Sequence, residues 1–182
     1  MARIELPEKG WVPSPVWEVY TSAENRLGYI PNTLKATSHS LRSLRAIDHL
    51  IQAHEEQGTL EPELRIFASL AAAHRNQNEY GVAQILRQAR RFFLAEEKLD
   101  AILQDRVEET LFSPQEIAVV RFARAMTDRA DAGEAALAEI RQYLSEEKVV
   151  ELTFIVAGRN FLDRIQCTFD VDTEPEVMAE RN

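Results

Sequence analysis

The sequence predicts an all-α fold of about eight helices. Over most of the chain, apolar residues recur at spacings of three and four, which gathers them on one face of a helix. No segment shows the sustained period-two alternation of a strand, and the 182 residues include only six glycines. These patterns favour a multi-helix bundle over any architecture that contains a sheet.

The expected helices have recognisable start and stop signals. Ser14-Pro15 begins the first helix and Gly28 ends it, since serine caps free amides, proline suits the first turn and glycine adopts the left-handed conformation beyond a helix end. Asn32 is expected to cap a second, short helix. The clearest start is Ser113-Pro114-Gln115-Glu116, which predicts a capping box. The helices after Gly28 are expected at residues 32–36, 40–57, 62–73, 80–89, 94–103, 113–127, 135–144 and 145–165.

The length fits a single domain with short extensions. Residues 1–13 are expected to form an irregular N-terminal arm, because prolines and a glycine interrupt them. One helical domain is expected at 14–167. Residues 168–182 are expected to form an acidic tail, because the helical pattern fades after Cys167.

Charge and cysteine content exclude several classes of partner and site. The formal net charge is −9 and the basic residues form no long run, so nucleic acid is not an expected partner, and neither is a membrane. No window approaches the apolar length of a membrane span, and the first residues lack a signal-peptide core. The single cysteine cannot form an internal disulfide and fits a reducing compartment. A cytoplasmic location is predicted.

Common catalytic and metal-binding motifs are missing. The chain contains no Gly-x-Ser-x-Gly, no phosphate-binding loop and no Gly-x-Gly-x-x-Gly. His54-Glu55 resembles the start of a zinc-binding His-Glu-x-x-His, but Gly58 stands where the second histidine is needed. We therefore expect no metal and no cofactor.

A polar joint between two expected helices is the one cluster that could carry chemistry. We call residues His74 to Glu79 the elbow. One interpretation is a helix connection whose polar groups satisfy free backbone ends. The other is a small pocket, with Tyr80 and Gln84 on one face of the following helix and a carboxylate near the phenol for proton transfer. The candidates for such a pocket are Glu63, His74, Glu79, Tyr80 and Gln84.

The segment around the elbow, LEPELRIFASLAAAHRNQNEYGVAQI, resembles the signature helices of the carboxymuconolactone decarboxylase-like superfamily, which includes the AhpD-type alkylhydroperoxidases. RLGYIPN, SPQEIAVVRFARAMT and EEKVVELTFIVAGRNFLDRI resemble other parts of its longer members. The resemblance implies an AhpD-like helical bundle that assembles as a homo-oligomer, either a dimer, a trimer or a hexamer. It also implies a peroxidase-related protein with a small-molecule ligand.

The resemblance places unreactive residues at the family's reactive positions. Asn78 and Gly81 fall where the peroxidases carry Cys-x-x-Cys, Ile85 falls at their histidine and Ile66 at their glutamate. None of these four side chains can become a thiolate or relay a proton. The site therefore resembles a degenerate thiol peroxidase site.

The decarboxylase branch of the superfamily is the nearer match at the elbow. Glu79, Tyr80 and Gln84 agree with its pattern, although Ile85 again replaces a histidine. Glu63 is a candidate for a displaced acid.

Three functions stay open from the sequence, and it does not decide whether the chain is an enzyme. The first is a peroxidase-related protein of this superfamily without thiol peroxidase activity. The second is a non-redox acid–base enzyme acting on a small organic acid or lactone, with Arg75 holding a substrate carboxylate. The third is a non-catalytic oligomeric interaction module that binds partners through its arm or its tail.

Overall fold

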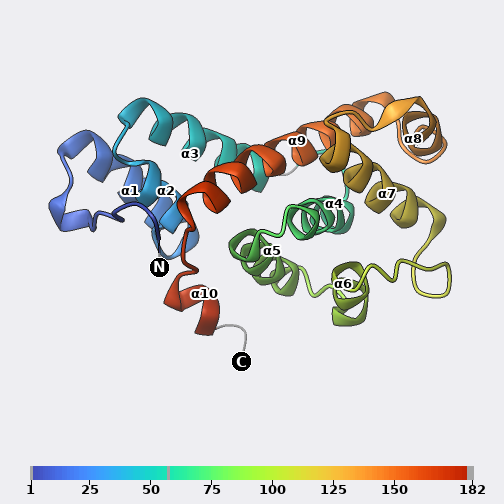
Figure 1. Cartoon of the computed structure of the whole chain (residues 1–182), viewed down its shortest axis with the longest axis horizontal. Coiled ribbons are helices and arrows are strands. Elements are labelled where there is room, and N and C mark those ends of the chain that lie inside the picture. Colours follow the sequence, from blue (N-terminus) through green and yellow to red (C-terminus); the bar gives the residue numbers. More distant parts are fainter. Residues whose placement is uncertain (1, 57, 180–182) are drawn as a thin grey trace. The chain divides into compact units, whose positions relative to one another are not determined.

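The computed structural model describes residues 2–56 and 58–179. Within these ranges all regular structure is helical, with ten α-helices and one 3-10 turn (Figure 1). Eight of the α-helices have eight or more residues, which confirms the prediction of an all-α chain. Among the described helices, none is both long and apolar enough to cross a membrane.

The chain divides into two compact units, one of Met1–Glu56 with Arg164–Asn182 and one of Gln57–Asp163. The longest helix, α9 (Glu146–Phe169), contributes residues to both units. The predicted division into an arm, one domain and a tail stays a prediction.

The helices of the first unit are η1 (Lys9–Trp11), α1 (Ser14–Leu27), α2 (Asn32–Thr37), α3 (Leu41–Glu55) and α10 (Pro175–Ala179). Gly28, with φ 83°, ends α1, as its position in the sequence predicts. Ser40 caps α3 by accepting a hydrogen bond from the Ser43 amide.

The arm and the tail are both packed onto this unit. The Arg3 amide donates to the Phe169 carbonyl at 2.7 Å, so the N-terminal arm lies against the end of α9. Asn32 is not a helix cap, as had been predicted, because its side-chain amide donates instead to the Asp172 carbonyl at 2.9 Å. The sequence also predicted that helical structure fades after Cys167. This is wrong, because α9 continues to Phe169 and α10 follows it.

The second unit is built around α4 (Pro62–Arg75), which packs against α5 (Glu79–Arg91), α6 (Glu96–Leu103) and α7 (Pro114–Arg129). Figure 1 shows α4 between these neighbours. Ala71, Ala72 and Ala73 are fully buried, and side chains of this size allow neighbouring helices to pack closely. The unit is completed by α8 (Gly133–Ile140) and the greater part of α9.

The capping box that the sequence predicts at the start of α7 is present. The Ser113 hydroxyl accepts from the Glu116 amide, and the Glu116 carboxylate accepts from the Ser113 amide. This reciprocal pair satisfies two of the free amides at the helix start. It also holds the Glu116 side chain, which is buried, in a fixed place.

Candidate functional site

The elbow is a short, well-bonded turn between α4 and α5. Gln77 has φ 55°, a left-handed conformation that reverses the chain. The next residue, Asn78, caps α5, because its side-chain oxygen accepts from the Gly81 amide at 3.1 Å. These local bonds agree with the first interpretation of the elbow, in which its polar groups satisfy the free backbone amides and carbonyls at the helix ends.

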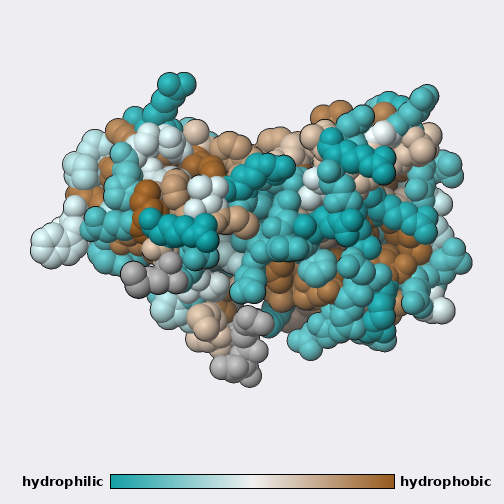
Figure 2. Space-filling model, in the orientation of Figure 1, coloured by the Kyte–Doolittle hydropathy of each residue, from teal (hydrophilic) through white to brown (hydrophobic). Residues whose placement is uncertain are grey.

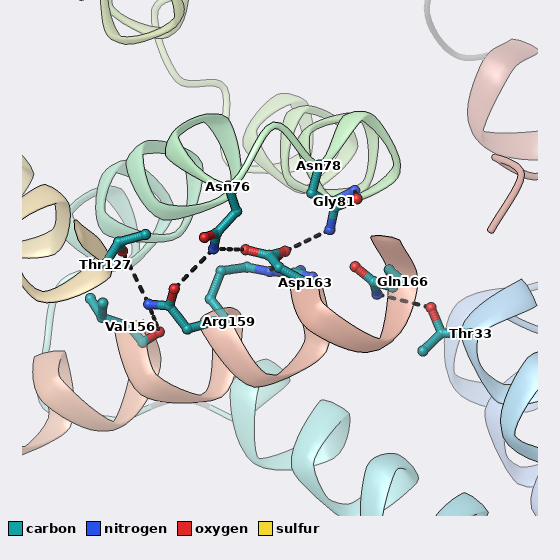
Figure 3. Close-up of polar contacts among 10 residues, drawn as sticks. Thr33, Asn76, Asn78, Gly81, Thr127, Val156, Arg159, Asp163 and Gln166 are labelled. Atoms are coloured by element: carbon teal, nitrogen blue, oxygen red, sulfur yellow. Dashed lines mark hydrogen bonds and ion pairs between the residues drawn. The ribbon is translucent and has the colours of Figure 1, made fainter. Parts of the chain in front are cut away.

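The elbow also holds a buried carboxylate, Asp163 of α9. Asn78 Nδ2 donates to Asp163 Oδ1 at 2.6 Å, and Asn76 Nδ2 donates to Asp163 Oδ2 at 2.7 Å. Arg159 Nε, one helical turn before Asp163, lies 2.7 Å from Oδ1 and makes an ion pair with it. Figure 3 shows both asparagines pointing from the elbow onto this carboxylate. The charge is thus fully compensated by one cation and two amides.

A second branch extends this network to α7. Asn76 Nδ2 also donates to Asn160 Oδ1 at 2.9 Å, and Asn160 Nδ2 in turn donates to the Thr127 hydroxyl at 3.0 Å. The elbow, α7 and α9 are therefore linked through side chains that are mostly buried. We call Asn76, Asn78, Arg159, Asn160 and Asp163 the Asp163 network.

The Asp163 network lies so close to the backbone of residue 81 that it leaves no room for a side chain there. A Cβ atom at this position would lie 2.6 Å from Asn78 Nδ2 and 3.0 Å from Asp163 Oδ1. The first distance is shorter than any van der Waals contact, and both atoms are held by hydrogen bonds. The two positions that the resemblance assigns to cysteines are thus filled by an amide that bonds Asp163 and by a residue without a side chain.

The other two motif positions belong to the apolar core. Ile66 and Ile85 are both buried within the main hydrophobic cluster of the second unit. Neither side chain contributes to the Asp163 network. The region around α4 and α5 therefore combines an apolar core with one mostly buried polar network.

The pocket candidates of α5 differ in their exposure to solvent. Glu79 is exposed to solvent, Tyr80 is 5% exposed, and Gln84 is half-buried. A carboxylate that faces water while the phenol is buried is a poor arrangement for proton transfer between them. Whether any of these side chains has a catalytic role stays a prediction.

The candidates at the end of α4 are engaged with other parts of the second unit. His74 Nε2 lies 3.7 Å from Asp105 Oδ2. Arg75 binds Asp128 in a two-pronged ion pair, with Nε at 2.7 Å and Nη2 at 2.9 Å. The guanidinium that was expected to hold a substrate carboxylate therefore already holds a carboxylate of the chain itself.

Glu63 belongs to a different cluster. It lies at the start of α4, about 16 Å along the helix from His74, so the two cannot meet at one small site. Lys98 Nζ lies 3.4 Å from Glu63 Oε1 and 2.6 Å from Glu116 Oε1. Although burial favours the neutral amine, hydrogen bonds to the two glutamates raise the pKa of Lys98 above its ordinary value. Glu63 thus supports a structural ion pair.

This cluster should make stability depend on pH through Glu116. Burial alone would raise the pKa of this carboxyl, but hydrogen bonds from Lys98 and Ser113 hold it below its ordinary value. Its stabilisation is therefore complete above the unfolded-chain value of about 4.3 and is lost as pH falls through the lower folded value. Urea unfolding between about pH 6 and pH 3 should show a shallower decline in Glu116→Gln than in wild type. The exposed control Glu97→Gln should retain the wild-type slope, and an unchanged slope in Glu116→Gln would contradict the assignment.

Sequence reasoning missed Arg159 and Asp163, the central charges of the network. Both are almost fully buried. They are four residues apart on a helix that is otherwise largely apolar, which places opposite charges on one face. That spacing was the available signal, because charged residues are almost never fully buried unless they are paired.

Side chains that can bind metals are scattered over residues 2–56 and 58–179. No group of three or more metal-ligating side chains gathers in these ranges. Cys167, the only cysteine of the sequence, is exposed.

The comparisons with known proteins identify the fold. No protein-family profile matches the chain, and no curated protein matches it. Among solved structures, a peroxidase-related protein from Silicibacter superposes with a TM-score of 0.83 at 17% identity, covering 97% of this chain and 93% of that one. An AhpD-core, peroxidase-related protein from Ralstonia eutropha gives 0.81 at 19% identity, covering 97% and 94%.

The chain has the AhpD fold. The debrominase Bmp8 shares this fold, with a TM-score of 0.77 at 21% identity over 91% of this chain and 89% of that one. Bmp8 has been solved alone and as a cysteine-to-alanine variant in complex with 2,3,4-tribromopyrrole. The AhpD fold was predicted from the residues of the elbow and the helices that follow it, and the superpositions confirm it.

Proposed function

We propose that this chain is a peroxidase-related, AhpD-fold protein without thiol peroxidase activity. The observation that carries the proposal is the contact of Asn78 and Asp163 beside Gly81. Thiol peroxidase chemistry needs a thiolate and a second thiol to complete a disulfide. The whole sequence contains one cysteine, and it lies outside the elbow.

In this proposal the elbow has a structural role. The elbow, α7 and α9 meet at the Asp163 network, and its hydrogen bonds fix the turn that joins α4 to α5. A fully satisfied buried polar network specifies one arrangement of its helices, whereas a partly satisfied one destabilises the fold. The proposed protein is a homo-oligomer. The elbow contains no cysteine, so any small-molecule ligand would be bound there without thiol chemistry.

The acid–base alternative has less support. It needs Glu79, Tyr80, Gln84 and His74 to face a common space, but Glu79 faces solvent and His74 is close to Asp105. The interaction-module alternative through a free arm or tail is weakened in the same way. The backbone amides of Ala2 and Arg3 donate to Asp172 and to the Phe169 carbonyl within the first unit, so the arm and the first residues of the tail are already bonded to one another.

A peroxide-consumption assay with a dithiol reductant tests the proposal. Wild type should consume peroxide no faster than the Cys167→Ser variant, and both should match the rate without protein. The reason is that a single exposed thiol cannot close the catalytic disulfide within one chain. Sustained turnover by wild type that Cys167→Ser abolishes would overturn the proposal.

A further inference from the structure

The solvent-facing side of α9 carries an apolar stripe. Val150 is 68% exposed, Phe154 42% and Phe161 49%, and the exposed Ala157 lies between the two phenylalanines. The four residues follow spacings of four, three and four, which keeps them on one narrow face of the helix. Figure 2 shows apolar residues in the middle of the upper edge of the molecule, where α9 runs.

The stripe has charges of opposite sign at its two ends. Glu147 lies three residues before Val150, and Arg164 lies three residues after Phe161. Both are exposed, and both continue the same face of the helix. The complete row therefore has the alternating three- and four-residue spacing of a helix-pairing seam.

We propose that this face of α9 pairs with α9 of a second copy of the chain, in antiparallel orientation about a two-fold axis. The axis crosses the helix between Ile155 and Val156. A two-fold contact must be self-complementary, since the same patch contributes both sides. The inference extends the proposed homo-oligomer by naming the face that forms it.

Side-chain size and charge match in this register. Each residue then faces one that lies equally far from the axis on the other side. Phe154 faces the small Ala157 of the second copy, and the smaller Val150 faces the large Phe161. Large side chains opposite small ones allow the two helices to interdigitate. At both ends Glu147 of one copy faces Arg164 of the other.

The parallel alternative places like charges together. Glu147 would face a second Glu147, and Arg164 a second Arg164, which is unfavourable on both sides. Phe154 would also face another Phe154 while Ala157 faced another alanine, which leaves a gap beside a crowded contact. The antiparallel register has neither defect.

The test is the molar mass in solution, measured by light scattering and sedimentation equilibrium across micromolar concentrations. Wild type should have a mass of two chains or a multiple of two. Phe161→Glu places a charge in the seam and should raise the dissociation constant about 30-fold or more, as for a hot-spot residue. The matched control is Phe93→Glu, since Phe93 is 94% exposed and lies outside α9. It should leave the mass unchanged.

Charge exchange tests the register itself. Glu147→Arg and Arg164→Glu should each weaken assembly, and the double variant should restore it, because the opposite charges face one another again. Circular dichroism melts identify any variant that is misfolded. A monomeric wild type would overturn both this face and the proposed oligomer. An oligomer that survives Phe161→Glu, or a double variant that fails to recover, would overturn this face alone.

Discussion

Replacing Asp163 by asparagine should lower the free energy of unfolding by about 3–5 kcal/mol, because it removes the carboxylate that is ion-paired with the buried Arg159 guanidinium. The two side chains are 1% and 8% exposed, so water cannot replace the lost partner. Asn76 and Asn78 each donate to one oxygen of the Asp163 carboxylate. In the variant the new side chain has only one oxygen, so one of the two asparagines would face an N–H group instead of an acceptor. Urea unfolding followed by far-ultraviolet circular dichroism measures the loss.

A matched control is Asp100→Asn, which changes an exposed aspartate of α6. It should alter the free energy of unfolding by no more than about 0.5 kcal/mol. If Asp163→Asn is as mild as this control, the network is not the structural centre of the elbow and the proposed role of Asp163 is wrong.

A double variant separates the pair interaction from simple loss of packing. In Arg159→Met with Asp163→Leu both charges are gone, and apolar side chains of similar size fill the space. Replacing a whole buried ion pair in this way is often neutral, whereas removing one partner is costly. We expect the double variant to be more stable than Asp163→Asn. Equal instability would show that the asparagines, rather than Arg159, account for the cost.

Local sequence signals predicted most helix boundaries, because they depend on neighbours within one turn. The capping box at Ser113 and Glu116 needs only a spacing of three, and the end of α1 needs only a glycine with positive φ. Signals of this kind do not report what lies across the fold. Asn32 looked like a cap from its neighbours, yet its partner is Asp172, at a sequence separation of 140 residues.

The Asp163 network could not be predicted for the same reason. Asn78 and Asp163 are 85 residues apart, and nothing in either segment indicates the other. The resemblance to AhpD-type proteins placed residues 78 and 81 at the motif positions of the family's two cysteines. It gave no account of why an amide and a glycine stand there, and the contacts with Asp163 supply one.

Replacing Gly81 by alanine should destabilise the protein by about 1–3 kcal/mol, the usual range for overpacking a filled core. Alanine gains about 1 kcal/mol of helix propensity over glycine. That gain is outweighed because the new Cβ would lie 2.6 Å from Asn78 Nδ2 and 3.0 Å from Asp163 Oδ1. Thermal and urea unfolding measure the net effect. Gly10→Ala is the control, since a Cβ there meets nothing within 4 Å.

Removing the Asn78 side chain tests whether it causes the clash at residue 81. In an Asn78→Ala background the nearest atoms are gone, so adding Gly81→Ala should cost less than it does in wild type. The two effects are therefore non-additive, as expected for groups in contact. A Gly81→Ala variant more stable than wild type would contradict the packing. If the prediction holds, a cysteine at residue 81 brings the same Cβ, and a Cys-x-x-Cys pair cannot be introduced at the elbow without first displacing Asp163.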